Sequence, residues 1–374
     1  MKPEMLEEIL LRFLKSKDAV AAHLQVHKGK IPEEILQAAM ESAQIRKVVR
    51  RKMAGMEERA EIAELRRKMA TQDWNELLIQ ARAMVLCGLP YKKTDLRQIT
   101  KSARLGSGQR LSVTFTALGT HPIPYGRDRA VLAWITTCAS RTGNPKVQFD
   151  SAMEFMRAFD LTDAGPNYKY LRECMDRLKS FSCYITVNND DSEASSQNSV
   201  VRQAILPSRI DMKHETRGEM RLPMIQRGFY VELDPTFFEE IQKHGVPIPL
   251  DLMKRYASNP LAWDFITFLN YRTRIGKTPS RIPMEVLAGM IGTANPNLRR
   301  LRFELDKILD ELREIWPELP AKFEGRGLKA VLYVAPPKNG AFLVSDRNRV
   351  PALGTLPEPP DGLPEGEPAA EESG

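Results

Sequence analysis

The sequence predicts an α+β, mostly helical fold that contains two tandem winged-helix domains. The first reason is an order of elements that occurs twice: strand, helix, strand, short helix, turn, long helix and β-ribbon. The second is a basic balance, with a formal net charge of +7 at pH 7. The third is length, because 374 residues exceed one ordinary core and suit two or three domains.

Residues 1–86 are predicted to form a helical N-terminal extension. Residues 33–70 are almost entirely strong helix formers, and Pro32 just before them suits a first helical turn. The extension also contains a cluster of cations: Arg46, Lys47, Arg50, Arg51 and Lys52. This cluster fits a solvated helix face, and it also fits an arm that contacts DNA or mediates dimerisation.

Residues 87–110 are predicted to be a basic linker, because glycines and Pro90 interrupt the helical pattern among many Lys and Arg residues. The first winged-helix domain is predicted over residues 111–228. Its expected elements are a strand at 111–117, helices at 125–141 and 167–181, a strand at 146–149, a short helix capped by Ser151, and β-stretches at 184–187 and 200–206 on either side of a polar loop at 188–199.

The second winged-helix domain is predicted over residues 229–336. Its expected elements are strands at 229–233, 280–282 and 328–334, helices at 260–274, 283–290 and 297–316, and a turn at 292–296. The two halves share this order without a residue-level repeat.

Residues 337–374 are predicted to be a disordered, Pro-rich acidic tail, because hydrophobic periodicity ends there. From Ala352 onward the tail contains Asp and Glu but no Lys or Arg. The preceding residues are therefore more basic than the whole-chain average, as expected of a protein that binds a polyanion.

The cysteines are predicted to be small buried hydrophobes. None of Cys87, Cys138, Cys174 and Cys183 forms a CxxC pair, which disfavours a zinc ribbon. Neither a signal peptide nor an apolar run of about 18 residues occurs, so we expect a cytoplasmic protein.

The two long helices are the predicted DNA-reading elements, because a helix fits the major groove and its side chains reach base edges there. The helix at 167–181 buries Leu171, Met175 and Leu178; its candidate DNA contacts are Tyr168, Lys169, Arg172 and Lys179. The helix at 297–316 has the apolar stripe Leu298, Leu301, Leu305, Ile308 and Leu312; its candidate contacts are Asn297, Arg299, Arg300 and Arg302. Acidic neighbours leave open that Arg300 only pairs with Glu304 at i,i+4.

Four segments resemble plasmid-encoded RepA-type replication initiators. Gly119–Arg129 resembles the start of their first winged helix, and Arg127 and Arg129 within it are candidate DNA contacts. Phe229–Phe238, Pro247–Leu252 and Pro260–Arg272 follow at the expected distances, the last being the most specific. The resemblance runs from about Lys92 to Pro336, and Trp263 departs from it where the family more often has a smaller aliphatic residue.

The resemblance implies a bacterial, plasmid-associated protein that binds repeated duplex sites, called iterons, at a replication origin. It further implies opening of an AT-rich stretch, recruitment of host helicase and primase, and often repression of the protein's own promoter. In such initiators dimers tend to repress and monomers tend to initiate, so a homodimer in equilibrium with a monomer is expected.

The sequence lacks the motifs of the enzymes that act at origins, so we expect no enzyme, cofactor or metal. Gly276-Lys277-Thr278 resembles the end of a P-loop, but its first glycine would fall at Tyr271. No His-x-His pair of a nickase occurs among the histidines. The alternatives are a winged-helix transcriptional repressor or partition-type DNA-binding protein and, further away, a primase or nickase.

Overall fold

The computed structural model describes residues 43–70, 76–105, 109–149, 151–188, 193–205, 229–275, 278–291, 297–325, 329–337 and 343–344. The chain divides into two compact units. The first comprises residues 1–71 with 314–316, and the second comprises residues 72–313 with 317–374. The predicted helices before residue 43 and nearly all of the predicted acidic tail lie outside the described residues.

Among its described residues, the first unit contains one long helix, α4 (Ala43–Ala70). Strong helix formers and charge pairs within the helix favour it, for example the ion pair between Arg67 and Glu64 at 2.6 Å. The helix predicted over residues 33–70 is therefore confirmed over the described part of that range.

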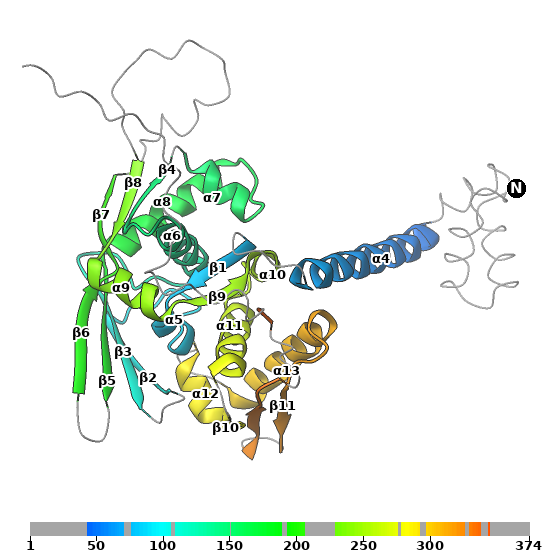
Figure 1. Cartoon of the computed structure of the whole chain (residues 1–374). Helices are drawn as coiled ribbons and strands as arrows, with labels where there is room; N and C mark the ends of the chain where they lie inside the picture. Colours follow the sequence, from blue (N-terminus) through cyan, green and yellow to red (C-terminus); the bar gives the residue numbers. More distant parts are fainter. Residues whose placement is uncertain are drawn as a thin grey trace, which may run out of the picture. The chain divides into compact units, whose positions relative to one another are not determined.

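The first half of the second unit contains the predicted strand, helix, strand, short helix and long helix. The predicted β-ribbon of 184–187 with 200–206 is wrong, because these two strands lie in different sheets and pair with other strands. A helix, α6 (Asp128–Thr142), ends at Gly143, whose φ of 64° is the left-handed conformation that glycine adopts without strain. It is followed by β4 (Lys146–Phe149), α7 (Met153–Ala158), α8 (Gly165–Lys179) and, after two strands that belong to another sheet, by β7 (Val201–Ile205) and β8 (Phe229–Leu233). The three strands form an antiparallel sheet in the order β4-β8-β7 (Figure 1).

The second half of this unit has the same order, except that it lacks an equivalent of the two strands between α8 and β7. It consists of α11 (Pro260–Ile275), β10 (Ser280–Pro283), α12 (Met284–Met290), α13 (Leu298–Ile315), β11 (Ala321–Glu324) and β12 (Val331–Val334). Its strands form an antiparallel sheet in the order β10-β12-β11. In both halves the last strand therefore lies between the first and second strands.

A four-stranded sheet accompanies the first half, in the order β2 (Gln98–Arg104), β3 (Arg110–Ala117), β5 (Phe181–Asn188) and β6 (Glu193–Ser199). Burial alternates along β3, as in a sheet with one face in the core. The predicted linker at 87–110 and the predicted loop at 188–199 are therefore wrong where they contain β2 and β6. Both strands are polar, and their pairing with β3 and β5 outweighs their sequence.

The predicted start of the second domain at residue 229 is also wrong for its first strand. β8 pairs with β4 through Val147 and Val231, so it completes the sheet of the first half. Its sequence Phe-Tyr-Val-Glu-Leu identifies a strand, but the partner strand is a tertiary property.

The predicted helical extension also contains a buried strand. β1 (Leu77–Gln80) pairs antiparallel with β9 (Val246–Pro249), and the short helix α5 (Arg82–Leu86) follows it. Two further helices, α9 (Pro235–His244) and α10 (Leu250–Arg255), lie on either side of β9 in the chain. The residues of β1 are at most 4% exposed, so this segment belongs to the core of the second unit.

The core of the second unit includes Trp263 on α11, which is fully buried. Its indole Nε1–H donates to Gln80 Oε1 at 3.1 Å, and its ring centroid lies 6.2 Å from that of Phe159. The indole that departs from the family pattern is thus accommodated with a hydrogen-bond partner. Cys87, Cys174 and Cys183 are buried free thiols, and burial raises the pKa of Cys87 to about 12.

Candidate nucleic-acid interface

A buried ion pair fixes α8 against α6. Asp128 is fully buried at the start of α6 and accepts two hydrogen bonds from Arg177 of α8, at 2.7 and 2.8 Å. The Tyr170 hydroxyl donates to the same carboxylate at 3.1 Å, as does the Tyr125 backbone N–H at 2.9 Å. With this side of α8 anchored, the opposite side is left for solvent or a ligand.

The short helix before α8 begins with a reciprocal pair of hydrogen bonds. Ser151 Oγ accepts from the Met153 N–H at 3.2 Å, and Glu154 Oε1 accepts from the Ser151 N–H at 3.4 Å. The pair differs from a capping box in that Ser151 bonds the N–H of the second residue after it and not of the third, and Ala152 is the N-cap residue of α7. It supports the predicted helix start near Ser151 and thereby the order of α7 and α8.

The predicted contacts on α8 differ in accessibility. Lys169 is the most open, with a side chain 80% exposed and only a 3.9 Å approach to Glu173. Lys179, at the far end of the helix, forms an ion pair with Asp176 at 2.9 Å. Tyr168 is half-buried and donates its hydroxyl to Met153 Sδ at 3.1 Å, and Arg172 lines an apolar hollow with Trp134 and Phe155. Lys169 is therefore the strongest candidate on α8.

The start of α13 has a local cap that the sequence pattern favours. Asn297 Oδ1 accepts from the Arg300 N–H at 3.1 Å, which satisfies one of the free N–H groups of the first turn. Asn297 therefore has a helix-capping role. Leu301, Leu305 and Leu312 are buried, which confirms the predicted apolar stripe at these positions.

Two of the three predicted arginines on α13 face solvent. Arg299 is exposed, and no described residue pairs with its guanidinium. The side chain of Arg300 is 79% exposed and pairs with Glu304 at 2.8 Å. Such an exposed i,i+4 pair contributes little to stability and is easily exchanged for a phosphate.

Arg302 lies in a different environment. Its side chain is only 27% exposed, pairs with Asp306 at 2.9 Å, and lies 5.2 Å from the centre of the Phe323 ring on β11. The guanidinium thus packs between helix and sheet. Arg302 is a poorer candidate for DNA contact than its neighbours, because its guanidinium already contacts the Asp306 carboxylate and the Phe323 ring.

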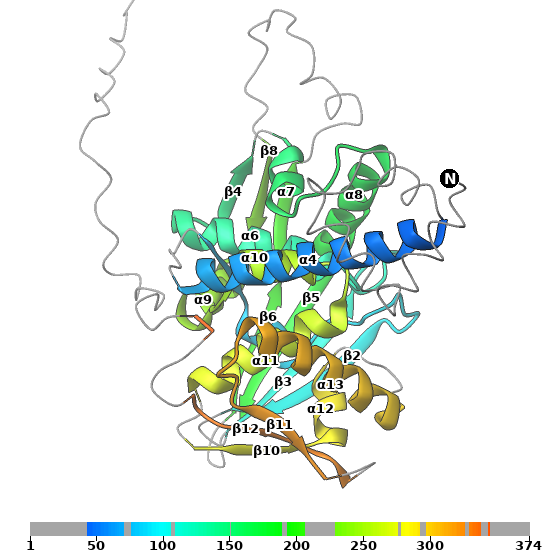
Figure 2. The same cartoon turned by 90° about the vertical axis from the view of Figure 1, so that its right-hand side faces the viewer.

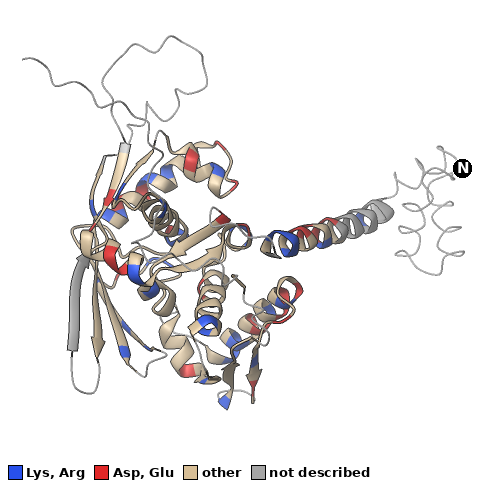
Figure 3. Ribbon diagram, viewed as in Figure 1, with Lys and Arg blue, Asp and Glu red and all other residues tan. Residues whose placement is uncertain are grey.

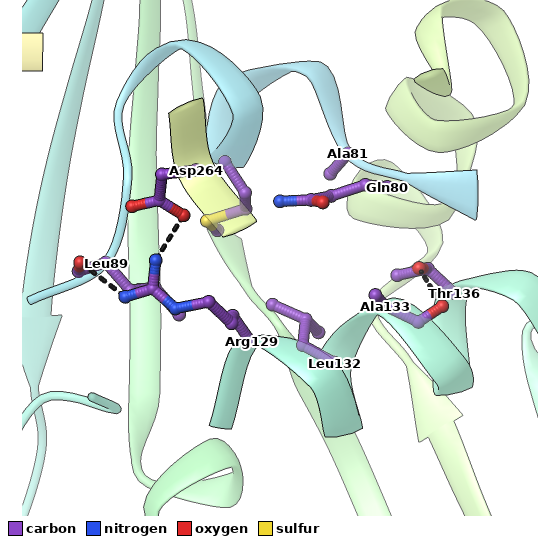
Figure 4. Close-up of a pocket in the computed structure, with 9 residues that line it drawn as sticks. Gln80, Ala81, Leu89, Arg129, Leu132, Ala133, Thr136 and Asp264 are labelled. Carbon is purple, nitrogen blue, oxygen red and sulfur yellow. Dashed lines mark hydrogen bonds and ion pairs between the residues drawn. The ribbon is translucent and has the colours of Figure 1, made fainter. Parts of the chain in front are cut away.

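Arg129 was a predicted DNA contact, and the structure contradicts this because its side chain is only 3% exposed. Its guanidinium pairs with Asp264 of α11 and donates to the carbonyl of Leu89 at 2.9 Å (Figure 4). It also donates to the carbonyl of Pro90 at 3.1 Å. Arg129 therefore joins the two halves of the second unit. Arg127 is half-buried, 5.2 Å from the centre of the Tyr170 ring.

A second buried cation lies at the same joint. Lys101 of β2 donates its Nζ to the carbonyls of Gly88 at 2.7 Å and Ile291 at 2.8 Å. Burial lowers the pKa of Lys101 to about 8, and the charge of Asp264 offsets part of this effect. Residues 88–90 thus accept hydrogen bonds from Lys101 and Arg129, and the same two cations contact Ile291 and Asp264 of the second half.

The low pKa of Lys101 predicts a pH-dependent stability. The unfolded chain keeps this proton up to about pH 10.5, whereas the folded protein releases it near pH 8, so unfolding takes up a proton between these values. The free energy of unfolding of the wild type minus that of Lys101→Met should therefore rise between pH 8 and pH 10.5 in denaturant titrations. Lys243→Met, which removes an exposed cation from α9, is the control for loss of a lysine charge. A constant difference between the wild type and Lys101→Met would refute the shifted pKa.

One functional candidate was missed by the sequence pattern. Phe303 on α13 is 60% exposed, more than any other large hydrophobic side chain in the described residues. It follows the buried Leu301 by only two positions, so it lies off the apolar stripe and the helical periodicity gave it no role. The spacing from Arg299 to Phe303 to Lys307, four residues each, is the sequence signal that could have found it.

Charges of both signs lie along α13 (Figure 3). Figure 2 shows this helix below α8 in the second unit.

Within the described residues no group of three His, Cys, Asp or Glu side chains could hold a metal ion. None of the described helices is long and apolar enough to span a membrane.

The comparison with known families concerns the first half of the second unit and the start of its second half. Residues 123–284 match the family model described as plasmid encoded RepA protein. The match confirms the resemblance predicted from the sequence, over a shorter range than Lys92–Pro336. It includes α8 and α11, whereas α13 lies beyond it.

Two solved structures of low identity are similar to the chain. One, described as RctB domains 2-3, is 17% identical and covers 67% of this chain and 95% of its own, with a TM-score of 0.44. The other, described as domains 2 and 3 of RctB in a selenomethionine derivative, is 15% identical and covers 66% and 92%, with a TM-score of 0.41. No curated protein sequence was found to match.

Proposed function

We propose that the chain is a plasmid replication initiator that binds repeated duplex DNA sites through two winged-helix domains. One observation supports the proposal: the two halves share a strand order and, apart from β5 and β6, an element order, and the long helix of each carries an exposed cation near its start. These cations are Lys169 on α8 and Arg299 on α13.

The arrangement suits duplex DNA for physical reasons. In a helix-turn-helix the second helix enters the major groove with its first residues, while the helix before it crosses the backbone. In this chain α8 and α13 take the first role, and α7 and α12 take the second. The exposed cations near the helix starts then lie where phosphates and guanine edges are closest.

The family match supports the assignment to plasmid replication, because residues 123–284 contain the long helix of the first half and the joint to the second half. The role of the second half rests on the repeated order alone. We infer a protein that acts by binding and not by catalysis, with opening of the origin driven by binding free energy. Distorting a site of roughly 20–30 base pairs costs roughly 1–6 kcal/mol, which additional contacts offset. Host helicase and other initiator proteins, and a second copy of the chain, are the proposed partners.

A replication assay tests the proposal. A minimal plasmid that carries the cognate origin and lacks this gene should replicate only when the protein is supplied from elsewhere. The Lys169→Ala, Arg299→Ala double variant should support fewer copies, while Lys243→Ala, which removes an exposed cation from α9, should behave as the wild type.

Two outcomes would overturn the proposal. Replication without the protein would exclude an initiator. Duplex binding that represses a promoter while the origin plasmid fails to replicate would favour the transcriptional repressor instead.

A further inference from the structure

The outward face of α13 presents an aromatic ring between two cations. Arg299, Phe303 and Lys307 follow one another at four-residue spacing, so they lie on one face of the helix. Phe303 is 60% exposed, and the Lys307 Nζ lies 5.0 Å from the centre of its ring. The ring is therefore open to a ligand on a helix whose other apolar side chains are buried, apart from the half-buried Leu298.

The charged side chains on this helix differ in whether they have a partner of opposite charge. The acidic residues between Arg299 and Arg313 each have a partner: Glu304 with Arg300, Asp306 with Arg302, Asp310 with Arg313, and Glu311 with the Tyr256 hydroxyl. Arg299 and Lys307 have no carboxylate partner among the described residues. The uncommitted charges next to Phe303 are thus both positive, which suits a polyanion better than an ordinary protein surface.

The spacing of these side chains also fits the major groove. The α-helix from Arg299 to Lys307 spans about 12 Å, which is about the width of the groove between its two backbones. Cations at this separation can reach phosphates on opposite sides while the ring between them faces base edges. The apolar group that base edges offer in this groove is the C5 methyl of thymine.

We propose that Phe303 is a specificity-determining residue that contacts the C5 methyl of a thymine in the bound site, with Arg299 and Lys307 on the flanking phosphates. The inference rests on the proposed binding of duplex DNA by α13 and adds the base that is read. An aromatic contact carries no charge, so it affects the choice of sequence and leaves the dependence of affinity on salt unchanged.

The test replaces thymine by deoxyuridine, which removes only the methyl group. The preferred site of the full chain is first selected from a pool of duplexes with a randomised central region, and each thymine in it is then replaced in turn. Loss of one buried methyl contact should weaken wild-type binding about fourfold at one position. Phe303→Ala should bind the thymine and deoxyuridine duplexes equally and keep the wild-type salt slope.

A matched variant and the remaining outcomes complete the test. Leu96→Ala removes a side chain of similar exposure (57%) from outside α13 and should retain the thymine preference. A Phe303→Ala protein that still prefers thymine would overturn the proposal. So would unchanged DNA binding together with failure of plasmid replication in cells, which would assign Phe303 to a protein partner. Absence of any duplex binding by the wild type would instead refute the proposed function itself.

Discussion

Replacing Arg129 with methionine should lower the free energy of unfolding by about 3–5 kcal/mol, because it removes the guanidinium that pairs with the buried carboxylate of Asp264. The side chains of this pair are only 3% and 2% exposed, so water cannot replace the lost partner. Carbonyl groups of Leu89 and Pro90 would lose donors as well. Denaturant titration of the full-length protein measures the effect.

Two further variants identify its cause. Arg127→Met removes a half-buried cation two residues away that lies over the Tyr170 ring, and it should cost about 1 kcal/mol or less. The double variant Arg129→Met, Asp264→Leu removes both charges and should recover much of the lost stability. If the Arg129→Met protein were as stable as the wild type but bound DNA more weakly, Arg129 would be a DNA contact, contrary to what its burial indicates.

Elements with a local signal were predicted closely from the sequence. β4 has the predicted bounds, 146–149, and α13 spans 298–315 against a prediction of 297–316. In both cases the periodicity and the end signals lie within the element itself. β2 and β6 lack such a signal, since Ser, Thr and Gln residues resemble a loop until β3 and β5 pair with them.

The same limit applies to the candidate site. Arg129 and Arg299 both lie near a helix start in a stretch rich in cations, and the sequence makes both of them candidate DNA contacts. Arg129 is buried and pairs with Asp264, which lies far along the chain. Arg299 is exposed, and no described residue pairs with it. Likewise Arg302 packs against the ring of Phe323 on β11 and is less exposed than Arg299 and Arg300. Accessibility depends on such distant partners, which a single sequence does not identify.

Removing Lys169 and Arg299 together is expected to weaken duplex binding in a salt-dependent way. Each cation that neutralises a phosphate releases a counter-ion, so each contributes about one unit to the slope of log affinity against log salt concentration. These two side chains lie on different long helices, and both are exposed. Their loss should leave the fold intact, because surface substitutions usually change stability by about 0.5 kcal/mol or less.

The salt dependence of duplex binding is the measurement that tests most directly whether α8 and α13 bind DNA. Affinity for the selected duplex is measured over a series of salt concentrations for the wild type, the Lys169→Ala, Arg299→Ala double variant, and the Lys243→Ala control. We expect the wild type and the control to share one steep slope and the double variant to be shallower by about two units. An identical slope for all three proteins would contradict the assignment of these helices to DNA.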